Sequence, residues 1–167
     1  LNKKMKVLFI ILADNEEEKF KIKLSSDAGF YIPLGIAKIA AILENDKHLV
    51  KVLDTRLVSS DINKEMYTTI KKFKPDIIGF PMSLFSAKKV FYNSNFIKKH
   101  FDIPIVVGGP YASIFLERIL KQNNSIDIVV FGEGYYVISE ILSSIKTNKS
   151  LKNIKGIAFK ECNDVIV

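Results

Sequence analysis

The chain has 167 residues, of which 48% are hydrophobic and 26% are charged. This length fits one compact domain, and this composition excludes a disordered or low-complexity chain. The longest apolar run, Val7–Ala13, has seven residues. A membrane span needs roughly 18 residues, and the run also lacks the length and cleavage site of a signal peptide. We therefore predict a soluble, cytoplasmic protein with no membrane partner.

The net charge of +7 comes mostly from lysines spread along the whole chain, because Arg56 and Arg118 are the only arginines. Specific phosphate and base recognition favours arginine, so the pattern favours a solvated lysine surface over nucleic-acid binding. The single cysteine, Cys162, excludes an internal disulfide and a cysteine-built zinc or iron–sulfur site in this chain. Two histidines, His48 and His100, leave almost nothing for a histidine metal site.

The N-terminal part of the chain begins with a strand pattern. Lys6–Leu12 is apolar at every position after Lys6, which is typical of a strand buried on both faces. The polar stretch Asp14–Tyr31 predicts a long loop. Pro33–Glu44 predicts a helix that opens with proline, and Val50–Leu53 predicts a second strand. We expect Asp54, at the end of that strand, to cap a turn.

The middle of the chain repeats a strand followed by a helix. Asp61–Phe73 predicts a helix with Asp61 as its N-cap. Asp76–Phe80 predicts the third strand, and Ser86–His100 the helix after it. Ile103–Val107 predicts the fourth strand, and Ala112–Gln122 the next helix.

The last part of the chain completes the pattern and then changes it. Ile126–Phe131 predicts the fifth strand, and Tyr136–Thr147 the last helix. Lys155–Lys160 and Asp164–Val167 are short β-rich runs that predict a hairpin. Five β-then-α units predict an α/β fold: a doubly wound, five-stranded parallel sheet of flavodoxin-like or Rossmann-like order 2-1-3-4-5, with a C-terminal β-hairpin.

Ligands of such sheets bind at the carboxyl ends of the strands. Two glycine-rich turns fall there, Gly108-Gly109 after the fourth strand and Gly132-Glu133-Gly134 after the fifth. Glycine lets a ligand approach the backbone closely. His48 and His100 precede strands and therefore belong to the opposite edge. The absence of a glycine-rich phosphate loop after the first strand weighs against a nucleotide-binding or flavin-binding enzyme.

Six segments follow one another in the order of a known family. They are Pro33–Leu43 (PLGIAKIAAIL), Val52–Asp54 (VLD), Pro75–Phe80 (PDIIGF), Val106–Ser113 (VVGGPYAS), Val130–Gly134 (VFGEG) and Ile154–Phe159 (IKGIAF). Together they resemble the N-terminal cobalamin-binding domain of B12-dependent radical SAM enzymes. That group includes class B methyltransferases and the anaerobic magnesium-protoporphyrin IX monomethyl ester cyclase type.

The resemblance implies that cobalamin binds at the strand ends, with its nucleotide tail in a cleft and its corrin ring over the edge. It implies cofactor contacts from four groups of residues: Tyr31, Pro33 and Leu34; Met82, Ser83 and Leu84; Gly108, Gly109, Pro110 and Tyr111; and Gly132, Glu133 and Gly134.

The chain departs from the family pattern in several places. The D-x-H-x-x-G motif, whose histidine coordinates cobalt in other B12 proteins, is absent, and Ala13–Ile32 contains no histidine. The resemblance therefore implies cobalamin held without a protein histidine ligand. Pro81 stands where the family often has serine, Tyr111 replaces the usual histidine, and Tyr135 replaces the second glutamate of GEGE.

The resemblance also implies a longer parent protein. Residues 1–150 would form the cobalamin-binding domain, and residues 151–167 would begin a hairpin or linker to a C-terminal radical SAM domain. That domain would carry a [4Fe–4S] cluster and S-adenosylmethionine and would act on a small-molecule substrate, by methyl transfer or as a cyclase. The chain alone is then expected to be catalytically inert.

One alternative belongs to another class of protein, a flavodoxin-like docking module that has lost cobalamin binding. A Gly109→Val substitution is expected to separate the two, abolishing ligand binding while the fold survives.

Overall fold

The computed structural model describes residues 4–12, 33–58, 61–162 and 164–167. The predicted loop Asp14–Tyr31, and with it the candidate residue Tyr31, lies outside these ranges. The strands of the described part are β1 (Lys6–Ile11), β2 (Leu49–Asp54), β3 (Ile77–Pro81), β4 (Ile105–Gly108), β5 (Ile128–Val130), β6 (Ile157–Glu161) and β7 (Asp164–Ile166). The helices are α2 (Leu34–Asn45), α3 (Ile62–Phe73), α4 (Ala87–His100), α5 (Pro110–Gln122) and α6 (Ile138–Thr147), with short 3-10 helices η1 (Thr55–Leu57) and η2 (Gly134–Tyr136).

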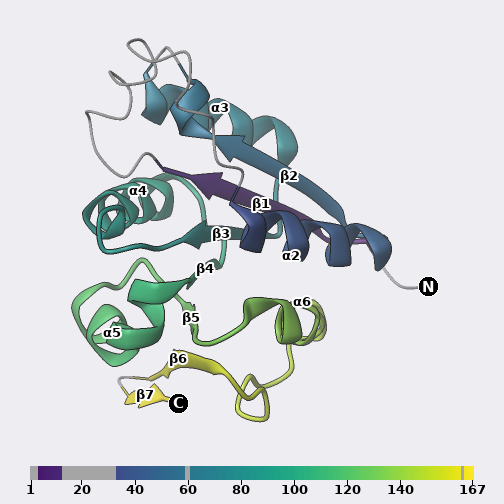
Figure 1. Cartoon of the computed structure of the whole chain (residues 1–167), viewed down its shortest axis with the longest axis vertical. Helices are drawn as coiled ribbons and strands as arrows, with labels where there is room; N and C mark the ends of the chain where they lie inside the picture. Colours follow the sequence, from purple (N-terminus) through teal and green to yellow (C-terminus); the bar gives the residue numbers. More distant parts are fainter. Residues whose placement is uncertain (1–3, 13–32, 59–60, 163) are drawn as a thin grey trace.

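The strands form one sheet in the order β2-β1-β3-β4-β5-β6-β7 (Figure 1). Strands β1 to β5 are parallel, whereas β6 and β7 are antiparallel to their neighbours. The predicted α/β class and mostly parallel sheet are confirmed, and β1 to β5 follow the predicted order 2-1-3-4-5, but the sheet as a whole has seven strands instead of five. The hairpin extends the sheet to seven strands, because β6 pairs with the free edge of β5, with Val130 opposite Ile157.

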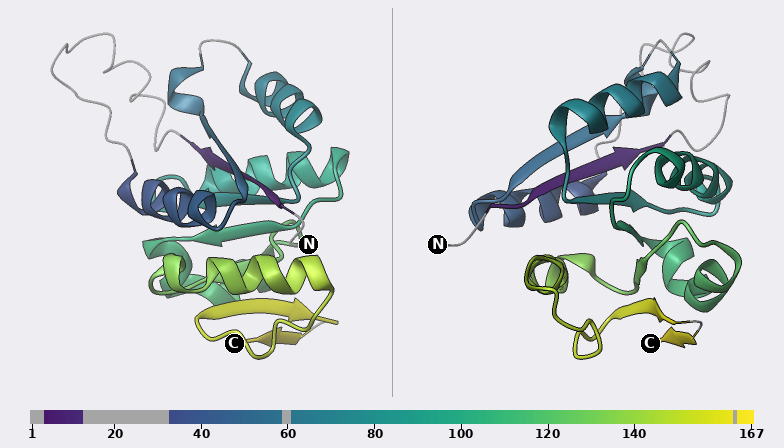
Figure 2. Two further views of the ribbon diagram at one scale, coloured as in Figure 1. Left: turned by 90° about the vertical axis from the view of Figure 1, so that its right-hand side faces the viewer. Right: turned by 180° about the vertical axis from the view of Figure 1, so that it is seen from behind.

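Helices cover both faces of the sheet (Figure 2). Side chains alternate between the faces along a strand. Leu8 and Ile10 of β1 therefore pack in a core with α3, α4 and α5, while Val7 and Phe9 pack in a second core with α2 and α6. All four side chains are buried, which confirms the predicted burial of β1 on both faces. None of the helices in the described ranges is both long enough and apolar enough to span a membrane.

Local signals set several helix ends. The Asp61 carboxylate caps α3 as predicted, accepting the backbone N–H groups two and three residues later at 2.8 and 3.4 Å. Pro110 opens α5, two residues before the predicted start at Ala112. The predicted start of the helix Tyr136–Thr147 is wrong. The chain first forms η2, and α6 begins only at Ile138.

Two aspartates join neighbouring strands at the amino edge of the sheet. Asp76, just before β3, donates its N–H to the Lys6 carbonyl at 2.8 Å, and its carboxylate accepts the Lys6 N–H at 2.7 Å. Asp127, just before β5, makes the same pair of bonds with Ile105 at 3.0 and 2.7 Å. Its carboxylate also lies 2.8 Å from the Lys98 ammonium. These bonds hold the register of β1 with β3 and of β4 with β5.

Candidate functional site

The carboxyl edge of the sheet gathers the connections that follow β3, β4 and β5. The register places Pro81 level with Gly108, and Gly108 level with Val130. Backbone hydrogen bonds join the first two connections. The Met82 N–H donates to the Gly108 carbonyl at 2.7 Å, and the Met82 carbonyl accepts the Tyr111 N–H at 3.2 Å. Three of the four groups of candidate residues therefore lie at one edge.

Gly109 occupies a backbone conformation that is open essentially to glycine alone. Its φ is +113° and its ψ is −177°, and it forms the N-cap of α5. A Cβ at this position would lie 2.9 Å from the carbonyl oxygen of Met82 and 3.3 Å from its nitrogen. The absence of a side chain thus lets α5 start directly against the backbone that follows β3.

The other glycines of the edge serve different purposes. Gly132 has a φ of +72°, and none of the residues that the structure describes comes within 4 Å of where its Cβ would be. A Cβ on Gly134 would lie 3.3 Å from the side chain of Ile39 on α2. Gly134 therefore lets α2 approach η2, while Gly132 leaves room for a ligand.

The segment after β3 places its three candidate residues differently. The side chain of Met82 is 1% exposed and belongs to the core beneath α3, α4 and α5. Ser83 and Ser86 cap one another: the Ser83 N–H donates to Ser86 Oγ at 2.9 Å, and the Ser86 N–H donates to Ser83 Oγ at 3.1 Å. Leu84 is exposed. Of the three, Leu84 is the residue whose side chain a bound molecule can cover.

The reciprocal serine bonds predict a stability effect. Ser83→Ala removes the hydroxyl that accepts the Ser86 N–H at the start of α4, and we expect the free energy of unfolding to fall by about 1 kcal/mol. Urea unfolding followed by circular dichroism measures this change. Ser83→Thr keeps the acceptor and should stay close to the wild-type value. Equal stability of the alanine variant would show that the bond contributes nothing.

The remaining described candidates line the same edge at different depths. Pro33 is half-buried and opens α2, its carbonyl accepting an N–H one turn later at 3.0 Å. Leu34, next to it, is strongly exposed. The Tyr111 ring packs against Phe115, with 4.7 Å between the ring centroids, rather than projecting freely. Glu133 is exposed.

Three residues that the sequence reasoning did not select join α2 to η2. The Lys38 ammonium lies 3.3 Å from the centroid of the Tyr135 ring, and the Tyr135 and Tyr136 rings are 4.2 Å apart. A side-chain hydrogen bond with Tyr135 is the main cause that raises the pKa of Tyr136. Nothing in the sequence indicated that Lys38 and Tyr135 would meet, because α2 and η2 are distant along the chain.

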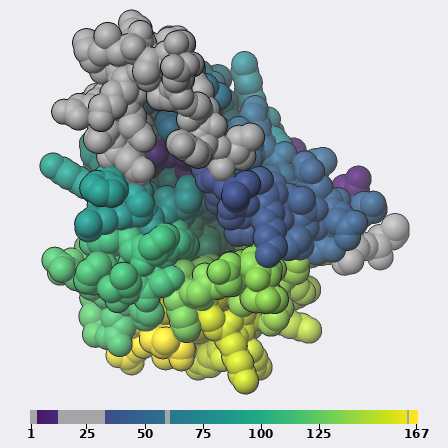
Figure 3. Space-filling model, viewed as in Figure 1, coloured from purple at the N-terminus to yellow at the C-terminus, as the bar shows by residue number. Residues whose placement is uncertain are grey.

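Exposed apolar side chains lie in or next to the described parts of the β-to-α connections at this edge. They are between 66% and 80% exposed, and they are Leu34, Leu57, Leu84, Phe85, Ile114 and Tyr136. In the space-filling view the dark-blue start of α2 lies beside the green residues of the later connections (Figure 3). A gathering of exposed apolar side chains at one place indicates a surface that binds something.

Asp54 serves the structure, as predicted. Its carboxylate accepts the Arg56 N–H at 3.0 Å and caps η1. The same carboxylate lies 2.7 Å from the Arg56 guanidinium. This ion pair occupies the end of β2.

Both histidines lie at the amino edge, opposite the candidate site. His48 precedes β2, and its Nδ1 accepts the Met5 N–H at 3.2 Å. His100 ends α4, and its ring centroid lies 5.6 Å from that of Tyr67. Within the described ranges, no group of three or more His, Cys, Asp and Glu residues could hold a metal ion.

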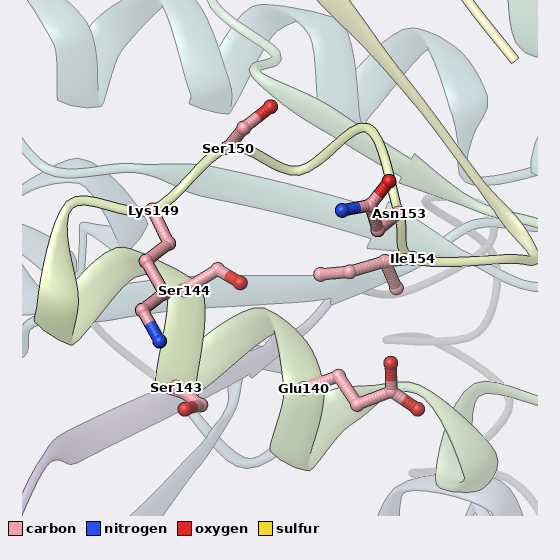
Figure 4. Close-up of a pocket in the computed structure, with 7 residues that line it drawn as sticks. All are labelled: Glu140, Ser143, Ser144, Lys149, Ser150, Asn153 and Ile154. Atoms are coloured by element: carbon pink, nitrogen blue, oxygen red, sulfur yellow. The ribbon is translucent and has the colours of Figure 1, made fainter.

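A separate cavity of about 440 Å³ lies between α6 and the segment that leads from it to β6 (Figure 4). Its lining consists of Glu140, Ser143, Ser144, Lys149, Ser150, Asn153 and Ile154. None of the candidate residues lines it, so the cavity is distinct from the carboxyl-edge site.

Sequence comparison gives the site a family. A B12-binding domain model matches residues 21–142. An uncharacterized methyltransferase from Pyrococcus horikoshii is 33% identical over 162 residues, which cover 94% of this chain and 34% of that protein. The anaerobic magnesium-protoporphyrin IX monomethyl ester cyclase of Synechocystis sp. is 25% identical over 138 residues, which cover 80% of this chain and 27% of the cyclase. The chain therefore spans about a third or less of these relatives.

Solved structures share the fold. The radical S-adenosylmethionine methyltransferase TsrM from Kitasatospora setae, solved with cobalamin and a [4Fe–4S] cluster bound, aligns over 98% of this chain and 28% of its own, with a TM-score of 0.76 and 16% identity. The cobalamin-dependent S-adenosylmethionine radical enzyme OxsB, solved with aqua-cobalamin, aligns over 98% of this chain and 22% of its own, with a TM-score of 0.80 and 19% identity. From the family match and the fold together, the chain belongs to the B12-binding domain family.

Proposed function

We propose that this chain holds cobalamin at the carboxyl edge of its sheet, without a protein histidine on cobalt, and presents it to a radical SAM domain of the parent protein. The observation that carries the proposal is the geometry of Gly109. Its glycine-only conformation seats α5 against the Met82 backbone at the edge where open α/β sheets bind their ligands.

The residues present at the edge fit a large, partly apolar cofactor. Gly132 leaves its backbone open, so a ligand can approach it without meeting a side chain. Leu34, Leu84 and Phe85 are exposed at the same edge of the sheet, and a broad ring could cover them. Bound cobalamin would supply methyl transfer or related radical chemistry, which belongs to the cofactor. The residues of this chain would bind it, orient it and exclude water from its apolar face.

The histidine-free binding follows from where the imidazoles are. His48 and His100 are the only histidines of the chain, and both lie at the amino edge. Neither can reach a cofactor at the carboxyl edge. Cobalt would therefore have no imidazole ligand from this chain.

The proposed partner is the remainder of a longer protein. The relatives are about three times as long as the matched region or more, and the solved neighbours include one with a [4Fe–4S] cluster bound. Cys162 is the single cysteine here, so a [4Fe–4S] cluster and its S-adenosylmethionine would be held by another domain. This chain would then be inert alone, and the parent's reaction on its small-molecule substrate would be a methyl transfer or a cyclisation. A cytoplasmic location stays a prediction.

The test is a titration of the purified 167-residue chain with hydroxocobalamin, followed by absorption spectroscopy and gel filtration. We expect one cobalamin to co-elute with each chain, with a spectrum that lacks imidazole ligation. The His48→Ala/His100→Ala double variant should give the same spectrum.

Two results would overturn parts of the proposal. A spectrum that changes when the histidines are removed would contradict histidine-free binding. If neither this chain nor the parent protein binds hydroxocobalamin at high micromolar concentration, cobalamin binding is contradicted and the docking-module alternative is favoured.

A further inference from the structure

The connection after β5 is held in place from two sides. On one side the Phe131 N–H donates to the Gly156 carbonyl at 3.0 Å, a backbone bond to the segment that leads into β6. On the other side the Gly132 N–H donates to Ser113 Oγ at 3.2 Å, a bond to the first turns of α5. The second bond depends on a side chain, so a single substitution can remove it.

Ser113 is itself firmly placed. It lies in α5, where its N–H donates to the Gly109 carbonyl at 2.9 Å. Gly109 is fixed in turn against Met82. Through Ser113, the turn at Gly132 is therefore hydrogen-bonded to the same helix that begins at the Gly108-Gly109 turn. Without this hydrogen bond, Gly132 would lose this restraint, and no atom of the described residues lies within 4 Å of where its Cβ would be to replace it.

From this arrangement we propose that Ser113 is a positioning residue for the cofactor site, whose hydroxyl holds the Gly132 turn at the correct distance from the Gly108-Gly109 turn. The inference rests on the proposed function, because it assigns Ser113 to the same cobalamin site. The hydroxyl restricts the backbone of the Gly132 turn before the cofactor binds. The loss of conformational entropy on binding is therefore smaller.

The experiment compares Ser113→Ala with Ser113→Thr, which keeps the hydroxyl, and with Ser143→Ala, an exposed helical serine away from the edge. We expect Ser113→Ala to raise the dissociation constant for hydroxocobalamin by about 3- to 10-fold, the range of one net hydrogen bond. The threonine and Ser143→Ala variants should stay within about twofold of wild type. The melting temperatures of all four proteins show whether each one is folded.

A second measurement isolates the bond from the fold. Hydrogen exchange of the Gly132 amide, followed by NMR in the cofactor-free chain, should be faster in Ser113→Ala and close to wild type in Ser113→Thr. A general loss of packing would instead speed exchange across the sheet. If wild type binds cobalamin and Ser113→Ala binds it equally well, the inference is wrong and the proposed function stands. If wild type binds none, the proposed function fails, and the role of Ser113 in cofactor binding fails with it.

Discussion

Gly109→Val should lower the free energy of unfolding by about 3 kcal/mol or more, the largest effect expected of any single change at the site. The residue has a φ of +113° and a ψ of −177°, which a β-branched side chain adopts only with strain. Its Cβ would also lie 2.9 Å from the Met82 carbonyl oxygen. Backbone cannot rotate away as a side chain can, so the connection after β3 would have to move. Urea unfolding measures the loss.

Gly35→Ala is the matched control. Gly35 lies in the first turn of α2, and within the described part of the chain no atom lies within 4 Å of where its Cβ would be. This change should leave stability equal or raise it by about 0.5 kcal/mol. Wild-type stability in Gly109→Val would mean that the backbone at Gly109 differs from the one described. The expected loss also changes the use of this variant. The sequence suggested that this variant would separate a cofactor site from a docking module. Because the substitution is expected to destabilise the fold as well as the site, a loss of binding would not distinguish the two.

Leu84→Asp should weaken hydroxocobalamin binding by about 30-fold or more while leaving stability unchanged. Leu84 is 68% exposed, so a charge there costs the free chain little. Covering that charge with an apolar part of the cofactor would cost about 2 kcal/mol or more, which corresponds to about 30-fold in the dissociation constant. Absorption titration measures the binding, and thermal unfolding measures the stability.

Leu49→Asp makes the same chemical change at the opposite edge. Leu49 begins β2 and is 46% exposed. Its variant should bind hydroxocobalamin as wild type does. Equal weakening by both substitutions would point to the added charge in general, and wild-type binding by Leu84→Asp would remove Leu84 from the site.

Features that depend on neighbours in sequence could be predicted. The apolar run of β1 is buried on both faces, and Asp61 and Asp54 cap the elements that follow them. Periodicity and capping chemistry are local, so one sequence displays them. Both ends of β5 were less accurate, because the predicted strand Ile126–Phe131 extends beyond the three paired residues Ile128–Val130. A run of apolar residues reports burial and not hydrogen-bond pairing.

Features that depend on distant residues could not be predicted. The hairpin signal predicted two strands but not that β6 would pair with β5. The contact of Lys38 with Tyr135 joins α2 to η2, and the bond of Ser113 with Gly132 joins α5 to the turn after β5. Each requires the folded sheet to bring its partners together. Of the candidate residues, Met82 had looked available to a ligand, yet its side chain is in the core.

Asp76 and Asp127 fix the starts of β3 and β5 at the amino edge, so the number of residues in each strand sets the position of the turn at its carboxyl end. Asp76 is bonded to Lys6, and five residues later the chain reaches Pro81, level with Gly108. Asp127 is bonded to Ile105, and three residues later it reaches Val130. An insertion in either interval would shift one turn of the site by about 3.3 Å and move the following side chains to the opposite layer. Related domains should therefore vary in length in their helices and connections, and keep the number of residues from each aspartate to its turn constant.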